Sequence, residues 1–435
     1  MNARVLLLCS STSYRTNDFL HAARELDLSV VVGLSKPCAL GQLSDGRALL
    51  LDFNALHESV ARIVSFTHGG PMHAVVGIDE CTMPLAGAAS QALGLAHNSA
   101  DSILAAHDKY SFRCALSRAG LPSPRFSLVA LRADLQRTAA RMVYPCVLKP
   151  RGLSGSCGVI RADNPADFVA AARRIAAILQ GRVSGEHGES ILVETFIPGR
   201  EVALEGLLED GRLQVLALFD KPEPLDGPFF EETVYVTPSR LPDRQQQAIS
   251  SVVAAAAAAL GLRSGPVHAE LRVNAAGVWP IELAARSIGG RCAGSLSFGN
   301  AVSLEQLILR QATGLPTAHL RRERCASGVM MMPIPHTGQL LAVEGLEAAR
   351  AVPCIEHAIV DAHPGESLVP LPEGDRYLGF LFARAESPRL VHAALRDAFA
   401  RLRFRIRRYS AVDTRLTRYH QRANRFIPLE NPSIR

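Results

Sequence analysis

The segment "YPCVLKPRGLSGSCGVI", residues 144–160, decides how the centre of this chain is interpreted. Apolar residues at 147–148 and 159–160 are typical of two buried strands. The loop 152–158 between them consists mostly of small residues, and Lys149 stands at its mouth. Backbone N–H groups of such a loop can approach phosphate oxygens, while a lysine supplies a point charge. It is not a Walker loop, because the G-x-x-x-x-G-K-[ST] order is missing and the loop joins two strands. A plain β-turn beside a surface lysine is the alternative.

Lysine is rare in this chain, which sharpens the question of why Lys149 is there. The 47 basic residues include only four lysines, Lys36, Lys109, Lys149 and Lys221, so arginine supplies the general positive charge. A retained lysine therefore indicates a need for a compact ammonium group on a flexible stem. Codon bias with leftover lysines is the alternative at any single position, and we interpret Lys36 in that way.

Length and composition indicate a multidomain globular protein. A chain of 435 residues exceeds what one core holds, and roughly two to four domains are expected. The nine cysteines are scattered without C-x-x-C pairs, which favours reduced thiols in the cytosol. The apolar run "VLLLC" is too short for a signal peptide or a membrane span. We therefore expect a cytoplasmic protein without a membrane partner.

The net charge of +6 is mild for this length, and the positive excess lies near the end, at 401–409 and 415–425. The run "RLRFRIR" alternates as a strand with one wet face does, and no aromatic-rich binding motif accompanies it. We therefore expect no nucleic-acid partner.

The order of apolar segments predicts an α/β region followed by α+β regions. Strands at 4–9, 28–33 and 73–78 alternate with helical patterns, which indicates a parallel sheet of βαβ type. No G-x-G-x-x-G fingerprint follows the first strand. Further along, the patterns predict helices at 108–120, 165–180, 241–261 and 388–402, a polar loop at 181–190, a shaped loop at 219–236 and short strands after about residue 325.

Two glutamates in a predicted hairpin, residues 267–286, are candidate metal ligands. Glu270 and Glu282 lie twelve residues apart among strongly apolar neighbours, and burying carboxylates without a partner is costly. They share one sheet face only if the hairpin contains a bulge or an odd turn. Two glutamates on a solvated face are the alternative. Arg286 shares strand parity with Glu282 and could serve both a carboxylate and a metal-held phosphate.

The segment "VETFIPGRE", residues 193–201, suits an adenine clamp. Backbone groups after Glu194 can read a purine edge, and Phe196 can cover a ring. A simple strand edge is the alternative for this piece alone.

These features, taken in order along nearly the whole chain, resemble the ATP-grasp superfamily. The run "IELAARSIGG" is most similar to the L-amino acid ligase group. The resemblance implies a Rossmann-like pre-ATP-grasp domain at 1–100 and a two-lobed ATP-grasp domain at 101–325, whose lid lobe covers about 122–200. It also implies a small α+β domain at 326–435, similar to that of the biotin carboxylase-like branch.

The resemblance also implies roles for individual residues. Lys149 and Arg286 would be catalytic, and Glu270 and Glu282 would bind Mg²⁺, with Mn²⁺ as an alternative. ATP would be held by Lys109, Lys149, Ser154, Gly155, Ser156, Gly158, Glu194, Thr195, Phe196, Ile197 and Glu201. Ala284 stands where many family members carry an asparagine as a third metal ligand, which leaves a second magnesium open.

The implied reaction is ATP-dependent ligation of a carboxylate and an amine, both small molecules such as amino acids. The carboxylate would become an acyl phosphate, with ADP and then phosphate released, and the product would be an amide such as a dipeptide. A biotin carboxylase-like enzyme and a catalytically silent nucleotide-binding regulator are the alternatives. Whether the chain forms a homodimer stays open.

Overall fold

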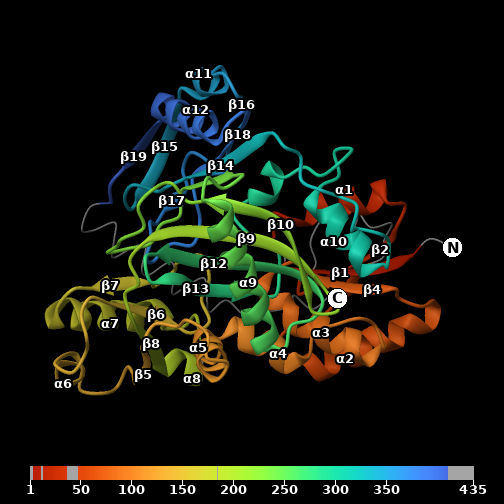
Figure 1. Cartoon of the computed structure of the whole chain (residues 1–435), viewed down its shortest axis with the longest axis horizontal. Coiled ribbons are helices and arrows are strands. Elements are labelled where there is room, and N and C mark those ends of the chain that lie inside the picture. The colour runs from red at the N-terminus through yellow and green to blue at the C-terminus, as the bar shows by residue number, and fades with distance from the viewer. Residues whose placement is uncertain (1–2, 11–12, 37–47, 184, 410–435) are drawn as a thin grey trace, which may run out of the picture.

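The computed structural model describes residues 3–10, 13–36, 48–183 and 185–409 (Figure 1). Helices and sheets are mixed throughout, which confirms the predicted α/β and α+β classes. The basic stretch at 415–425 lies outside the described residues. None of the helices in the described part is both long and apolar enough to cross a membrane.

The N-terminal sheet is parallel, as the sequence predicts. Its strands follow the order β3-β2-β1-β4, and every pairing in it is parallel. The strands are β1 (Arg4–Cys9), β2 (Ser29–Leu34), β3 (Ala48–Leu50) and β4 (Ala74–Gly77). The helices of this region are α1 (Thr16–Glu25), α2 (Leu56–Phe66) and α3 (Met83–Ala92), with short turns η2 (Thr67–Gly69) and η3 (Glu80–Thr82). The loops after β1 and β4 leave the same edge of the sheet because parallel strands end together.

A second, four-stranded antiparallel sheet holds the glycine-rich loop between two of its strands. The order is β5-β8-β6-β7, formed by β5 (Phe126–Ala130), β6 (Cys146–Pro150), β7 (Ile160–Ala162) and β8 (Ser190–Thr195). Helix α7 (Pro165–Leu179) buries an apolar face against it, and the short α6 (Leu135–Ala139) packs on α7. The loop predicted at 181–190 contains one helical turn, α8 (Glu186–Glu189).

The largest sheet has eight strands in the order β13-β12-β9-β10-β11-β14-β18-β16. Its strands are β9 (Arg200–Glu209), β10 (Arg212–Asp220), β11 (Val234–Thr237), β12 (Gly265–Asn274), β13 (Gly277–Ala284), β14 (Ala326–Met332), β16 (Ile355–Val360) and β18 (Gly379–Ala385). Around it lie α4 (Ala100–His107), α5 (Lys109–Arg118), α9 (Asp243–Leu260), η4 (Cys292–Ser295) and α10 (Leu304–Ala312). The sheet continues across residue 325, and the predicted domain boundaries stay predictions.

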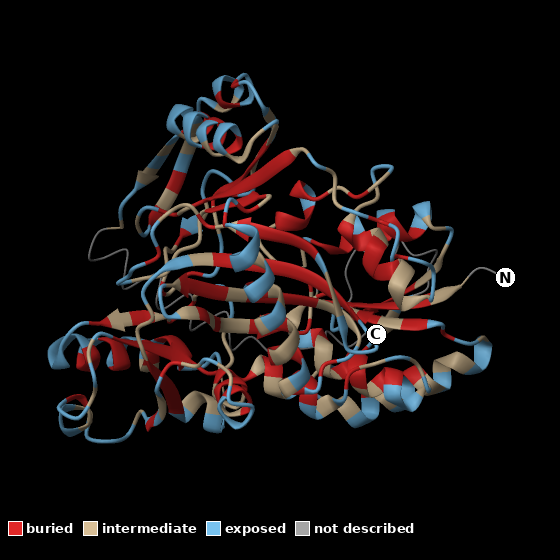
Figure 2. Ribbon diagram, viewed as in Figure 1, coloured by how far each residue is buried: buried red, intermediate tan, exposed pale blue. Residues whose placement is uncertain are grey.

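A three-stranded sheet and two helices complete the C-terminal region, which gathers at one end of the molecule (Figure 1). The elements are β15 (Gly338–Glu344), α11 (Leu346–Arg350), β17 (Ser367–Leu368), α12 (Pro388–Arg401) and β19 (Arg403–Arg407). In β19 the side chains alternate between exposed and half-buried, as predicted for an edge with one wet face. Figure 2 shows the strands of the largest sheet mostly buried, while the outer helices keep one exposed face.

Candidate active site

Lys149 is the last residue but one of β6, and its buried ammonium group points at a buried carboxylate. Its Nζ lies 2.7 Å from Oε2 of Glu194 on β8. Arg113 of α5 donates to both oxygens of Glu194, at 2.6 and 3.3 Å. Burial opposes ionisation of Glu194, but the charges of Arg113 and Lys149 outweigh it and lower the pKa to about 2. Glu194 therefore holds Lys149 in place as a carboxylate.

Residues at the N-terminus of α5 contact the first part of the glycine-rich loop and the residue before it. Asp108 caps this helix and accepts from Arg151 at 3.0 and 2.7 Å. Lys109 donates from Nζ to the carbonyl of Leu153 at 2.6 Å and lies 3.5 Å from Glu282. These contacts fix one side of the loop and bring the two predicted phosphate-binding lysines to its mouth.

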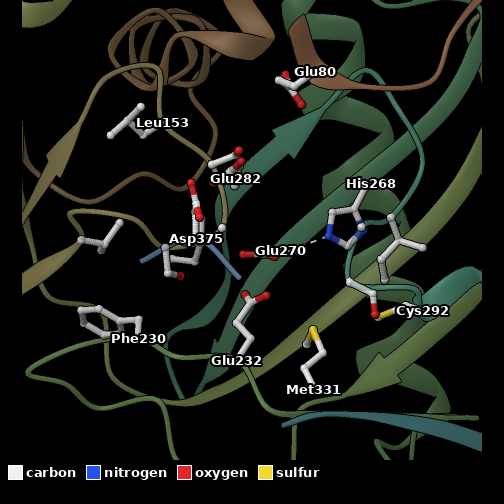
Figure 3. A pocket seen from close by; sticks show the side chains of 18 of the residues that line it. Glu80, Leu153, Phe230, Glu232, His268, Glu270, Glu282, Cys292, Met331 and Asp375 are labelled. Atoms are coloured by element: carbon white, nitrogen blue, oxygen red, sulfur yellow. Dashed lines mark hydrogen bonds and ion pairs between the residues drawn. The ribbon is translucent and has the colours of Figure 1, made fainter. Parts of the chain in front are cut away.

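The glutamate hairpin has the register that the metal hypothesis requires. Glu270 on β12 is directly opposite Glu282 on β13, because a bulge between Glu270 and Leu271 shifts the pairing by one residue. Directly opposite residues share a face, and Figure 3 shows both carboxylates in the cavity. Burial opposes ionisation of Glu282, but Lys109 and Arg286 lower its pKa below the usual value. Two carboxylate groups on one face offer the oxygen ligands that suit a hard divalent cation.

A lysine that the sequence did not assign occupies the centre of an acidic cluster beside this hairpin. The Nζ of Lys221 lies 2.9 Å from Glu201, 2.5 Å from Glu232 and 3.4 Å from Glu270. Tyr235 donates to the other oxygen of Glu232 at 2.6 Å. Burial and the nearby Glu270 raise the pKa of Glu232 to about 7. The rarity of lysine and the crowded loop at 219–236 were the available sequence signals.

Arg286 contacts Glu80, a residue 206 positions earlier in the chain. Its Nε donates to Oε2 of Glu80, which follows β4 in the N-terminal region. His107 contacts the other oxygen of Glu80 at 3.1 Å. Although burial opposes ionisation of Glu80, the charge of Arg286 holds its pKa well below the usual range. No motif in the sequence around Glu80 indicates this role.

These groups line one cavity of about 930 Å³. In what we call the nucleotide half, the lining includes Lys109, Lys149, Ser154, Gly155, Ser156, Glu194, Thr195, Phe196, Ile197, Glu201, Glu270 and Glu282. In what we call the substrate half, it includes Tyr14, Arg15, Asp79, Glu80, Arg286, Ile288, Cys292, Met331, Asp375, Arg376, Tyr377 and Phe380. Of the predicted residues, Gly158 lies outside the lining: its N–H donates to the carbonyl of Pro372 at 2.9 Å.

Two family matches agree with this architecture. Residues 142–295 match the ATP-grasp domain, and residues 330–407 match the L-amino acid ligase C-terminal domain 2. The first match covers the glycine-rich loop and the glutamate hairpin. The second covers the C-terminal region, apart from the start of β14.

Named relatives are ligases, and they match over part of their length. Alanine–anticapsin ligase of Bacillus subtilis is 27% identical over 62% of this chain and 61% of that protein. D-alanine–D-alanine ligase of Aromatoleum aromaticum is 29% identical over 36% of this chain and 49% of that protein. An uncharacterized protein of Sinorhizobium fredii is 24% identical over 88% of this chain and 79% of its own length.

Solved structures resemble this chain over most of its length. L-amino acid ligase from Bacillus licheniformis superposes with a TM-score of 0.81 at 26% identity, covering 93% of this chain and 99% of that one. Biotin carboxylase from Campylobacter jejuni shares the fold at a TM-score of 0.64 and 14% identity, covering 94% of this chain and 93% of that one. The resemblance to an L-amino acid ligase therefore extends over 93% of this chain.

Proposed function

The chain carries an ATP-grasp domain and an L-amino acid ligase C-terminal domain, and from this premise we propose that it joins the carboxylate of one amino acid to the amine of another at the expense of ATP. The observation that carries the proposal is the cavity itself. One continuous cavity of about 930 Å³ is lined by the glycine-rich loop, the glutamate hairpin and Arg286. It includes the substrate half, whose lining comes from three separate regions of the chain. That space suits a nucleotide with a further small substrate.

The nucleotide would occupy the half beside β6 and β8. Lys149 and Lys109 would contact its phosphates, and Ser154, Gly155, Ser156 and Gly158 would belong to the loop that covers them. Glu194 to Ile197 would form the hinge beside adenine, and Glu201 would reach the ribose. Glu201 already accepts from Lys221 and Arg272, but each of its oxygens has a second lone pair.

Glu270 and Glu282 would hold Mg²⁺, or Mn²⁺ in its place. When bound, the ion would neutralise charge that develops on the phosphate oxygens. Ala284 is buried and offers no third protein ligand on β13. Lys221 adds a fixed positive charge on the same side of the cavity, 3.4 Å from Glu270.

The chemistry would take place between Lys149 and Arg286. The substrate carboxylate attacks the γ-phosphorus, the bond to the β-phosphate oxygen breaks, and ADP leaves an acyl phosphate behind. The amine then attacks the acyl carbon, loses a proton, and expels phosphate as the amide forms. Lys149 and Arg286 stabilise negative charge in both steps, and closure of the glycine-rich loop would keep water away from the acyl phosphate.

The nucleotide product tests this function. Purified protein is given ATP, Mg²⁺ and pairs of amino acids, and nucleotides are separated by chromatography. We expect ADP and phosphate in step with an amide product, and a hydroxamate when hydroxylamine replaces the amine. AMP as the stoichiometric product would overturn the mechanism. Turnover with bicarbonate alone would support a carboxylating enzyme, and nucleotide binding without turnover on any pair would support a silent regulator.

The expected setting follows from the same proposal. The partners are small amino acid substrates, and the protein would work in the cytoplasm without nucleic acid or membrane contacts. Whether it works as a homodimer is a separate question for light scattering.

A further inference from the structure

The C-terminal segment 371–377, which we call the strap, connects the glycine-rich loop with the substrate half. It lies between β17 and β18, within the matched L-amino acid ligase C-terminal domain. The carbonyl of Pro372 accepts from the N–H of Gly158 at 2.9 Å and from the Cys157 thiol at 3.4 Å. The end of the loop that would cover the phosphates is therefore hydrogen-bonded to a region more than 200 residues later.

A second contact ties the strap to the helix behind the loop. Glu373 accepts from Arg174 of α7 at 2.5 and 2.9 Å. Its carbonyl accepts from Arg182 at 2.9 Å, and Arg182 also donates to the sulfur of Cys157 at 3.3 Å. The Arg174–Glu373 pair is about 40% exposed on both sides, at 43% and 38%, so water can replace it when the strap moves.

The next residues turn back into the cavity. Gly374 lies at this turn, and only glycine fits there, because an added Cβ would lie 2.0 Å from the carbonyl oxygen of Val369. Asp375 then lines the cavity, and Figure 3 shows its carboxylate among the side chains there. Arg376 is paired with Glu366 at 2.7 Å, whereas Asp375 has no hydrogen-bond or ion-pair partner among the described residues. An exposed acceptor thus faces the space next to the loop.

We propose that the strap positions the glycine-rich loop over ATP and that Asp375, carried on the same strap, contacts the ammonium group of an amino acid substrate. This rests on the proposed function. A substrate held by Asp375 fixes the strap, and the strap fixes Gly158 and Cys157 at the end of the loop. Binding of the amino acid and closure over the nucleotide are coupled through one short segment, and Glu373 is a positioning residue in it.

The positioning role is tested by reversing the charge pair. Glu373→Arg places three arginines together, and we expect the KM for ATP to rise about tenfold and affinity for a non-hydrolysable ATP analogue to fall equally. Adding Arg174→Glu should restore both to within about threefold of the parent. Arg173→Glu, an exposed neighbour on α7, is the matched control. Unchanged nucleotide affinity in Glu373→Arg, or no recovery in a folded double variant, would overturn the proposal.

The recognition role is tested with Asp375→Asn. We expect the KM for one amino acid to rise about tenfold, while the KM for ATP stays within about twofold. Glu386→Gln, an exposed carboxylate outside the cavity, is the control. Equal changes in all KM values, or none, would remove Asp375 from substrate recognition. If no amino acid pair gives ADP, the proposed function fails, whereas the analogue-binding result still decides the positioning role.

Discussion

The two halves of the cavity are built in different ways. The nucleotide half comes from residues 109 to 282, through β6, β8, β9 and the β12–β13 hairpin with the adjacent α5. The substrate half combines loops after β1 and β4, the stretch after β13, and residues from β14 and the strap. The first half is a set of local motifs on neighbouring strands. The second exists only because three distant regions meet.

This difference indicates where the chemistry is fixed and where specificity can vary. Residues on paired strands keep their spacing because the ladder sets it, as the bulge does for Glu270 and Glu282. Residues on the loops that line the substrate half can change one at a time without disturbing a ladder. Substitutions in the nucleotide half should therefore impair every reaction. Those in the substrate half should alter the choice of amino acid, except at Arg286 and its partner Glu80, where every reaction should again be impaired.

The largest effect is expected at the hairpin. Glu282→Gln should lower kcat by roughly 10³-fold for every amino acid pair, because it removes charge from the predicted metal site while conserving shape. Glu270→Gln should act in the same direction. Circular dichroism and thermal unfolding check that the fold is intact. Full turnover in the double variant would contradict the metal assignment and remove this distinction between the two halves of the cavity.

The second expectation separates the halves directly. Lys149→Ala should raise the KM for ATP by roughly 100-fold, since it removes the buried charge beside the loop and leaves Glu194 with Arg113 alone. Glu80→Gln should instead lower kcat and leave the KM for ATP unchanged, because Arg286, which we propose stabilises charge in both chemical steps, loses its ionised partner. Steady-state kinetics with each substrate varied in turn measures both. The same KM pattern in the two variants would break the comparison.

The third expectation concerns pH and the acidic cluster between the halves. Glu232 has a pKa of about 7 in the fold, against 4.5 without burial, so the folded state keeps a proton that the unfolded state releases between these values. The free energy of unfolding therefore falls as pH rises through this window. Glutamine does not titrate, so Glu232→Gln lacks this pH-dependent loss. The difference in free energy of unfolding between Glu232→Gln and the parent should therefore shift in favour of the variant by on the order of 2 kcal/mol from pH 4 to pH 8. Thermal unfolding at several pH values measures it; a pH-independent difference would contradict the raised pKa.

The smallest effect is expected in the glycine-rich loop. Gly158 has φ of +73°, and an added Cβ would lie 2.6 Å from the Pro150 ring. Gly158→Ala should cost about 1 kcal/mol of local stability and weaken ATP binding in proportion. Gly155 has φ of +61° but open space around it, so Gly155→Ala is the matched control for backbone strain alone. Equal behaviour of the two variants would show that the contact with Pro150 is unimportant.

The features that could be predicted from the amino-acid sequence are those with a short-range signature. The strand–loop–strand around Lys149, the parallel N-terminal strands and the glutamate hairpin follow from hydrophobic period and turn residues, which depend on neighbours in the chain. The hairpin also left one choice open, the bulge that places Glu270 opposite Glu282, because a one-residue shift has no marker in the sequence.

The contacts between distant residues across the cavity could not be predicted from the sequence, because they depend on the fold. Glu80 contacts Arg286 from 206 residues away, Lys221 lies in the acidic cluster, and Pro372 of the C-terminal region accepts a hydrogen bond from Gly158. Such pairs leave no periodic pattern in the sequence, because they join side chains or backbone groups that are far apart in the chain. Burial then makes the pairing energetically necessary, because a charge without a partner in that cavity wall would be costly.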